Sequence, residues 1–175
     1  MKRLILISGT MGSGKTTVTR ALQKILQPAA MLDGDWCWDI KPFTVNEETK
    51  EMVQENIAFL LRQFLHSSAC QNVLFCWVMD HKEIAEELLR RIGSETLSGV
   101  ELWQFSLLCT PETLETHIRQ DIERGLRTEG DIARSIARLP LYDALPTVKI
   151  PVDNITPEES AEKIVAFIHS GKQAV

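Results

Sequence analysis

Residues 4–17 read L-I-L-I-S-G-T-M-G-S-G-K-T-T, and this stretch decides the fold. Within it, Gly9 to Thr16 match G-x-x-x-x-G-K-T, the pattern of a loop that cradles phosphate groups. The apolar run before the loop predicts a buried strand, and the pattern after Lys15 predicts a helix. Because strand, loop and helix follow in the order that the motif requires, we predict a binding site for a nucleoside triphosphate.

The loop supplies the expected phosphate contacts. Its glycines let successive backbone N–H groups turn toward phosphate oxygens, and the helix N-terminus adds a favourable dipole for an anion. Lys15 is expected to reach the β- and γ-phosphates, and the Thr16 hydroxyl is expected to ligate Mg²⁺. The predicted nucleotide-binding residues of the loop are Gly9, Gly12, Ser13, Gly14, Lys15, Thr16 and Thr17.

The composition narrows the class of protein. The chain has 175 residues, of which 44% are hydrophobic and 25% are charged, which predicts one soluble globular domain. Its net charge of −5 counts against nucleic acid as a partner. No apolar run is long enough to span a bilayer, so no membrane association is expected. Because the four cysteines have no metal or redox spacing, we expect a reduced, cytoplasmic location.

Strand and helix patterns alternate along the chain. Apolar runs predict strands over residues 4–8, 29–32, 73–79, 102–109 and 147–152. Helices are predicted over residues 15–26, 47–65, 81–92, 111 to about 124, 128–139 and 157–169. The apolar stripe of the second helix is expected at Met52, Ile57, Leu60, Leu61 and Phe64. This order predicts an α/β fold, a parallel sheet covered by helices on both faces, with its ligands beyond the carboxyl ends of the strands.

Two aspartates follow the second predicted strand. Asp33 and Asp35 flank Gly34, and residues two apart in an extended chain face the same side. A carboxylate at this edge can accept a proton from a substrate hydroxyl or hold the water shell of Mg²⁺. The alternative is a structural aspartate that caps a turn or a helix.

Arginines gather in one later segment. They are Arg119, Arg124, Arg127, Arg134 and Arg138. Gly125 and Gly130 interrupt this stretch, as in a mobile flap that closes over a triphosphate and stabilises its charge. Arg124 and Arg127 flank the first glycine and are the leading candidates, whereas an exposed helix face with local ion pairs is the alternative.

Aromatic side chains and one histidine lie near the same edge. Trp36 and Trp38 follow the aspartates, and Trp77 ends a strand, so they predict either the wall of an apolar acceptor pocket or ordinary core. The four histidines have no metal spacing and are interpreted as structural, with a reservation for His81 at the predicted edge.

Taken together, these motifs resemble the small P-loop kinases of the nucleotide-kinase-like group. Relatives in that group include shikimate, gluconate and adenylylsulfate kinases and chloramphenicol phosphotransferase. L-D-G-D at residues 32–35 looks like the acidic motif of adenylylsulfate kinases, and T-P-E at 110–112 looks like the approach to the lid. D-N-I-T-P-E-E at 153–159 looks like the loop and final helix where such kinases hold adenine. The motifs span nearly the whole chain in the order of the group.

The resemblance implies a P-loop NTPase fold of three layers. Its five-stranded parallel sheet and its helical lid, at about residues 119–139, would lie within a single domain, 1–175. It also implies a kinase that transfers phosphate from ATP, with Mg²⁺, to a hydroxyl of an unidentified small molecule. In such a kinase Asp33 would hold the water shell of the metal, and Asp35 would deprotonate the acceptor. Lys15, Arg124 and Arg127 would stabilise the transferred phosphate. Asn154 would lie at the adenine.

Three departures limit the resemblance. The strand predicted over 73–79 lacks the acidic residue that many P-loop proteins use for metal. The arginine that follows L-D-G-D in adenylylsulfate kinases and the glycine triplet of shikimate kinases are also absent, which counts against sulfate-bearing acceptors and shikimate. A regulatory or non-catalytic nucleotide-binding protein is therefore the alternative function, and a monomer and a homodimer are both compatible with the sequence.

Overall fold

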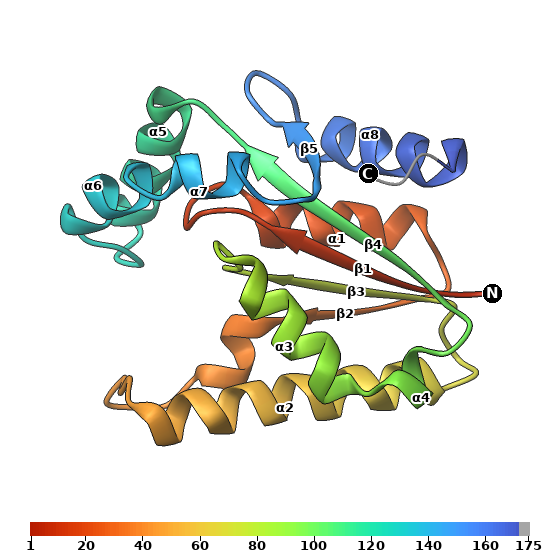
Figure 1. Ribbon diagram of the computed structural model, residues 1–175. Coiled ribbons are helices and arrows are strands. Elements are labelled where there is room, and N and C mark those ends of the chain that lie inside the picture. Colours follow the sequence, from red (N-terminus) through yellow and green to blue (C-terminus); the bar gives the residue numbers. More distant parts are fainter. Residues whose placement is uncertain (172–175) are drawn as a thin grey trace.

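The computed structural model describes residues 1–171, and its centre is a parallel sheet in the order β2-β3-β1-β4-β5 (Figure 1). The strands are β1 (Lys2–Ser8), β2 (Ala29–Asp33), β3 (Asn72–Trp77), β4 (Val100–Leu108) and β5 (Val148–Pro151). Every neighbouring pair is parallel. The prediction of a five-stranded parallel sheet is confirmed.

Helices cover both faces of this sheet. They are α1 (Lys15–Ile25), the 3₁₀ helix η1 (Gly34–Trp38), α2 (Glu47–His66), α3 (Lys82–Ile92), α4 (Ser94–Leu97), α5 (Pro111–Glu123), α6 (Gly130–Ile136), α7 (Leu139–Asp143) and α8 (Pro157–Ser170). In Figure 1, α1 and α8 lie on one face and α2 and α3 on the other, while α5 and α6 lie beyond the carboxyl ends of the strands. Within residues 1–171, no helix is both long and apolar enough to cross a membrane.

The continuous apolar runs of the sequence reflect burial on two sides. In β1, Ile5 and Ile7 pack into the core beneath α1 and α8, whereas Leu4 and Leu6 pack into the core beneath α2 and α3. All four side chains are at most 1% exposed. A central parallel strand therefore has no polar face, which is why its sequence does not alternate.

Two predictions about helices were wrong in detail. Met52 was expected on the buried stripe of α2, but it is 37% exposed, because Val53, one residue and about 100° further around the helix, faces the core instead. The helix predicted over 128–139 is present as α6 but ends at Ile136, and the separate helix α7, which begins at Leu139, was not predicted. Pro140 lies in the first turn of α7, where its missing N–H costs nothing, and it could not continue a longer helix.

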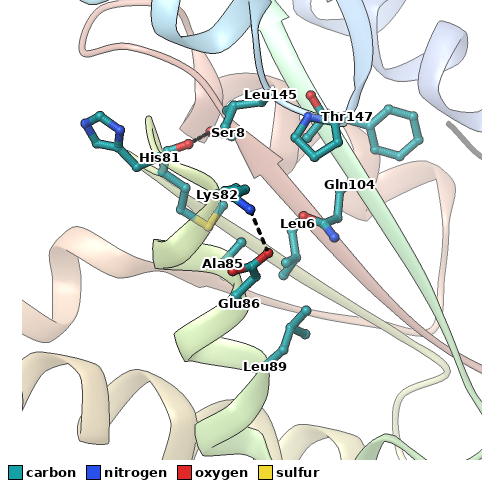
Figure 2. Close-up of a pocket in the computed structure, with 13 residues that line it drawn as sticks. Leu6, Ser8, His81, Lys82, Ala85, Glu86, Leu89, Gln104, Leu145 and Thr147 are labelled. Atoms are coloured by element: carbon teal, nitrogen blue, oxygen red, sulfur yellow. Dashed lines mark hydrogen bonds and ion pairs between the residues drawn. The ribbon is translucent and has the colours of Figure 1, made fainter. Parts of the chain in front are cut away.

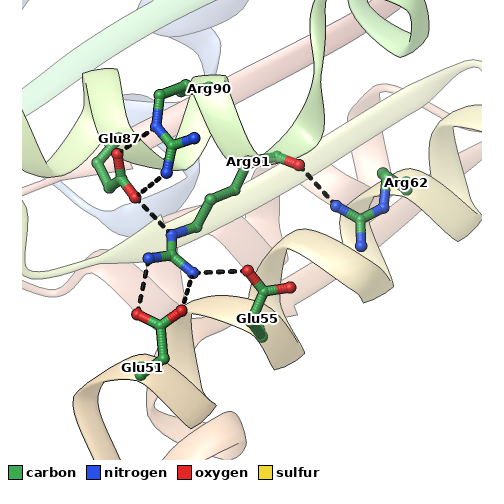
Figure 3. A network of polar contacts seen from close by, with 6 residues as sticks. All are labelled: Glu51, Glu55, Arg62, Glu87, Arg90 and Arg91. Carbon is green, nitrogen blue, oxygen red and sulfur yellow. Dashed lines mark hydrogen bonds and ion pairs between the residues drawn. The ribbon is translucent and has the colours of Figure 1, made fainter. Parts of the chain in front are cut away.

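An ion-pair cluster fastens α3 to α2 (Figure 3). Arg91 on α3 donates to Glu51 and Glu55 on α2, with Nη1 to Oε1 distances of 2.7 and 2.6 Å. It also donates from Nε to Glu87 on its own helix, at 2.7 Å. Arg62 on α2 donates in return to the backbone carbonyl of Arg91, at 2.6 Å. The two helices that cover one face of the sheet are thus joined by contacts in both directions.

Candidate active site

The P-loop joins β1 to α1 and lies against α5. Gly12 has φ 86° and could not carry a side chain, because a Cβ atom there would lie 2.7 Å from Cγ1 of Ile118. Its carbonyl oxygen also lies 3.0 Å from Nδ1 of His117. Gly14 precedes α1 with φ 85°, a left-handed conformation that favours glycine. The loop is therefore held in shape by α5, the helix that leads toward the predicted lid.

Lys15 is partly buried at the base of this loop. Its Nζ donates to the carbonyl oxygen of Thr10, at 3.0 Å. Burial lowers the pKa of the Lys15 ammonium group, and the nearby Asp35 carboxylate partly offsets that effect. Within residues 1–171 this carbonyl is its one hydrogen-bond partner, and a partly buried cation with a neutral partner is suited to receive a phosphate anion.

Asp33 joins the end of β2 to the start of α1. The Thr16 hydroxyl donates to Asp33 Oδ2 at 2.5 Å, and the Asp35 amide donates to Asp33 Oδ1 at 3.0 Å. The second contact caps η1, so Asp33 and Asp35 do not follow one another in extended chain as expected. Asp33 therefore has two roles: one carboxylate oxygen caps η1, and the other accepts from Thr16, the predicted metal ligand.

The missing acidic residue of β3 has a structural counterpart. Asp33 on β2 is the register neighbour of Cys76 on β3. Burial, with a smaller contribution from Asp33, raises the pKa of the Cys76 thiol to about 12, so it remains protonated at neutral pH. The oxygens of Thr16 and Asp33 are hard ligands that fit Mg²⁺. Within residues 1–171, His, Cys, Asp and Glu form no metal-binding group of three, and Mg²⁺ typically keeps waters and nucleotide phosphates as its other ligands.

Two cavities meet at this point. The P-loop cavity has a volume of about 480 Å³ and is lined by residues 12–18, by Asp35, His117, Gln120, Asp121, Arg124, Leu126 and Arg127, and by Val152, Ile155, Pro157 and Ser160. The arginine cavity has a volume of about 510 Å³ and is lined by Thr10, Met11, Lys15, Asp35, Trp38, Phe43, Val78, Arg127, Asp131, Arg134, Ser135 and Arg138. Lys15, Asp35 and Arg127 line both cavities.

The two leading arginines differ in their surroundings. Arg127 lines the same two cavities as Lys15, and after burial, the main cause, its charge also lowers the pKa of Lys15. Its Nε is buried and has no hydrogen-bond partner within residues 1–171. Arg124 lines the P-loop cavity alone, its side chain is 69% exposed, and it lies 3.9 Å from Asp121. An unpaired buried donor of Arg127 fits an anion better than the exposed side chain of Arg124 does.

Helix α6 is tied to the phosphate-binding loop. The Thr10 hydroxyl donates to the carbonyl oxygen of Ser135, at 3.1 Å. Asp131 accepts from the amide of Thr128, at 2.8 Å, and pairs with Arg134. The segment predicted as a lid therefore lies against the P-loop in this conformation.

Comparisons with known proteins agree with this geometry. A family model described as an AAA domain matches residues 5–134. The chain belongs to this family. No curated protein matches the chain.

Solved structures share the fold of this AAA domain protein over almost its whole length. Shikimate kinase from Acinetobacter baumannii, in complex with shikimate, is 21% identical with a TM-score of 0.66, covering 98% of this chain and 96% of that one. A gluconokinase from Sinorhizobium meliloti 1021 is 13% identical with a TM-score of 0.64, covering 98% of each chain. The tunicamycin resistance protein of Deinococcus radiodurans is 13% identical with a TM-score of 0.69, covering 96% of each chain. Together with the family match, this likeness confirms a nucleotide-kinase-like P-loop protein.

Not every predicted residue of the AAA domain protein lines a cavity. Asn154 is exposed with φ 56°, and its neighbours Val152 and Ile155 line the P-loop cavity instead. Gly9 is buried, and a Cβ atom there would lie 2.5 Å from Ser13 Oγ, so its contribution is to loop packing.

The three tryptophans predicted near the site lie in different surroundings. Trp38 lines the arginine cavity, as the pocket interpretation predicted. Trp77 packs against Gly34, where an added Cβ atom would lie 2.4 Å from its ring. Trp36 lies outside both cavities and stacks under Arg20, whose Cζ is 5.4 Å from the ring centroid.

His81 belongs to a different and smaller cavity, of about 70 Å³ (Figure 2). That cavity lies between α3 and the strands β1 and β4, and the Lys82–Glu86 ion pair, 3.9 Å long, crosses its wall. Figure 2 shows the His81 ring pointing away from Gln104 on the opposite wall. No P-loop residue lines this space, so His81 stands apart from the site.

One pairing in the site was not predicted. Asp80, after β3, accepts from Arg138 at 2.5 Å, and Arg138 lines the arginine cavity. Arg138 belongs to the arginine cluster of the sequence, and Asp80 directly follows the strand predicted over residues 73–79. Nothing local connects positions 58 residues apart.

Proposed function

We propose that this protein is an ATP-dependent phosphotransferase that moves the γ-phosphate to a hydroxyl of a small molecule. The observation that carries the proposal is the shared wall of the two cavities, where Asp35, Lys15 and Arg127 face both spaces. Transfer between two bound molecules needs one set of groups within reach of both reacting atoms. The solved kinases with the same fold support this assignment.

The P-loop cavity would take the nucleotide. Backbone amides of residues 12–17 and the Lys15 ammonium group would bind the phosphates. The base would lie toward Ile155 and Pro157, beside the Asn154 loop, with Arg124 near the entrance. The Ser13 hydroxyl in the cavity wall, which has no hydrogen-bond partner in the part of the chain that the structure describes, offers a further polar contact.

Thr16 and Asp33 would hold Mg²⁺. Their oxygen atoms already lie 2.5 Å apart, and both are hard ligands. When bound, the ion would neutralise charge on the β- and γ-phosphate oxygens.

The arginine cavity would take the acceptor. Asp35 would orient the acceptor hydroxyl and accept its proton as the hydroxyl oxygen attacks the γ-phosphorus. The bond from that phosphorus to the β–γ bridging oxygen breaks, and ADP leaves with the bridging oxygen. Lys15 and Arg127 would stabilise the charge on the transferred group.

The proposal is tested by measuring ATP consumption with purified protein and a panel of hydroxylated compounds, with ATP binding measured separately. A phosphotransferase consumes ATP in response to one class of compound and forms a phosphorylated product. ATP binding without turnover under any compound would favour a regulatory or non-catalytic nucleotide-binding protein instead.

A further inference from the structure

The arginine cavity carries more positive charge than a phosphoryl acceptor site requires. Four cationic side chains line it, those of Lys15, Arg127, Arg134 and Arg138. Such a wall would ordinarily indicate an acidic ligand, because arginine pairs readily with carboxylate and phosphate groups.

Two of these cations already have acidic partners inside the protein. Arg138 donates to Asp80 at 2.5 Å, and the Asp80 side chain is only 6% exposed. Arg134 pairs with Asp131, which is also buried and accepts a second hydrogen bond from the Thr128 amide, at 2.8 Å. Each pair is close to neutral as seen from the cavity.

The two remaining cations face the neighbouring cavity as well. Lys15 and Arg127 line the P-loop cavity, where the triphosphate of the proposed nucleotide would lie. Once the triphosphate engages them, the one charge left for an acceptor is the Asp35 carboxylate, which repels anions.

Neutral groups complete the wall. Ser135 is 2% exposed, and its hydroxyl has no hydrogen-bond partner within residues 1–171. Trp38 and Phe43 form an aromatic corner, with ring centroids 5.6 Å apart and a tilt of 48°. A hydroxyl or amide group would satisfy Ser135, and an apolar face would pack on the rings.

We propose that the acceptor is an uncharged molecule that carries hydroxyl groups and an apolar ring or face. Its polar groups would bind the Asp80–Arg138 pair and Ser135, and its apolar part would pack on Trp38 and Phe43. An anionic acceptor would meet Arg138 and Arg134 with their charge already offset by a buried carboxylate, so it would gain less attraction from them than from an unpaired arginine. This inference rests on the proposed kinase function, because that function assigns the arginine cavity to the acceptor.

The test compares uncharged compounds with acidic counterparts of similar shape. The pairs are myo-inositol and quinate, glucose and glucuronate, and uridine and uridine monophosphate. Binding of each is measured by calorimetry to the wild-type protein with Mg²⁺ and a non-hydrolysable ATP analogue bound, and phosphate transfer is measured separately with ATP. We expect at least one uncharged compound to bind at least about tenfold more tightly than its acidic counterpart.

Removing a buried carboxylate should shift the binding preference toward acidic compounds. Asp80→Asn leaves Arg138 with an uncompensated charge, so it should improve binding of acidic compounds about tenfold and shift the ratio toward them. Asp131→Asn is the second variant, and Asp143→Asn is the control, because it removes the same charge from an exposed position outside both cavities.

The outcomes separate the two proposals. Tighter binding of acidic compounds by the wild type, or no binding of any uncharged compound, overturns the inference, and so does an unchanged ratio in folded Asp80→Asn and Asp131→Asn. Transfer to an acidic compound would overturn it while supporting the kinase. If an uncharged compound binds preferentially but no phosphate is transferred to it, the inference about the arginine cavity is supported and the proposed kinase function is contradicted.

Discussion

The Thr16 hydroxyl and the Asp33 carboxylate are joined by a 2.5 Å hydrogen bond between the first turn of α1 and the end of β2. In the proposed metal site, this contact would let Asp33 take the place of the acidic residue that β3 lacks, because Asp33 reaches Thr16 from the adjacent strand. The other Asp33 oxygen caps η1 and so fixes the backbone that carries Asp35. One carboxylate therefore organises both the proposed metal ligand and the proposed base.

Replacing Asp33 should weaken metal binding selectively. Asp33→Asn keeps an oxygen for the η1 cap but loses the negative charge, so we expect the Mg²⁺ concentration for half-maximal ATP turnover to rise at least about tenfold. Titration of turnover with Mg²⁺ measures this. Asp39→Asn is the control, since Asp39 is exposed and lines neither main cavity. An unchanged Mg²⁺ requirement in Asp33→Asn would remove Asp33 from the metal site.

Lys15 is expected to strengthen ATP binding and to destabilise the nucleotide-free protein. Lys15→Met removes the cation expected on the phosphates, so ATP affinity should fall at least about tenfold. The same change should raise the melting temperature of the nucleotide-free protein, because burial makes the ammonium group unfavourable there. Calorimetric ATP titration and thermal unfolding measure the two effects, and unchanged ATP affinity would contradict the P-loop assignment.

The stability gain of Lys15→Met has a defined pH dependence. Because the pKa of Lys15 is lowered on folding, the unfolded chain binds more protons, and stability of the wild type rises with pH in that range. The penalty is fully present below the folded pKa and disappears as the pH rises to the unfolded value of about 10.4. The difference in melting temperature between variant and wild type should therefore shrink as the pH approaches that value.

Arg127 should matter more than Arg124. Arg127 lines both cavities, and its buried Nε has no hydrogen-bond partner among the described residues, so Arg127→Ala should lower kcat at least about a hundredfold. Arg124 is largely exposed, so Arg124→Ala should lower kcat by less than about tenfold. Steady-state kinetics of the two matched variants settle the order, and a larger loss in Arg124→Ala would refute it.

The Arg91 cluster should stabilise the fold at neutral pH more than in acid. Arg91 is 11% exposed at its side chain and joins α3 to α2, so Arg91→Met should lower the urea midpoint. Arg90→Met should lower it less, because Arg90 contacts Glu87 on its own helix and its side chain is 69% exposed. An equal decrease of the urea midpoint in the two variants would contradict the role of Arg91 in joining α3 to α2.

The sign of the acid effect follows from the carboxylates. Hydrogen bonding by Arg91 lowers the pKa of Glu51, and hydrogen bonding by Arg90, followed by Arg91, lowers that of Glu87 to about 2. Stability from such groups is present above the unfolded pKa of about 4.3 and is lost as the pH falls through the folded pKa. The difference in urea midpoint between wild type and Arg91→Met should shrink between about pH 4.3 and pH 2.

The elements that local patterns control could be predicted from the sequence. Residues 4–17 show strand, loop and helix in succession, and Thr110-Pro111 marks the start of α5, where Thr110 accepts from the Thr113 amide. Burial of a strand on both faces also follows from an unbroken apolar run, as in β1. These features depend on neighbours in the chain, so one sequence suffices.

The pairings across the site could not be predicted in this way. Asp80 with Arg138 and Thr10 with Ser135 join positions 58 and 125 residues apart, and their contact depends on how α6 and α7 pack. The cap at the 3₁₀ turn was predicted only as an alternative, because the local sequence D-G-D is compatible both with extended chain and with a turn capped by Asp33. Met52 was misplaced because an apolar stripe about 100° wide can be drawn through several neighbouring sets of residues.

The most direct test of the central claim is acceptor-dependent ATP consumption by the wild type and by Asp35→Asn, with ATP affinity measured on both proteins. The account predicts that a hydroxylated compound stimulates turnover and is phosphorylated. It also predicts that Asp35→Asn lowers that rate at least about a hundredfold while ATP affinity stays within a few fold. Turnover by Asp35→Asn at the wild-type rate, or ATP binding with no compound that stimulates turnover, would contradict it.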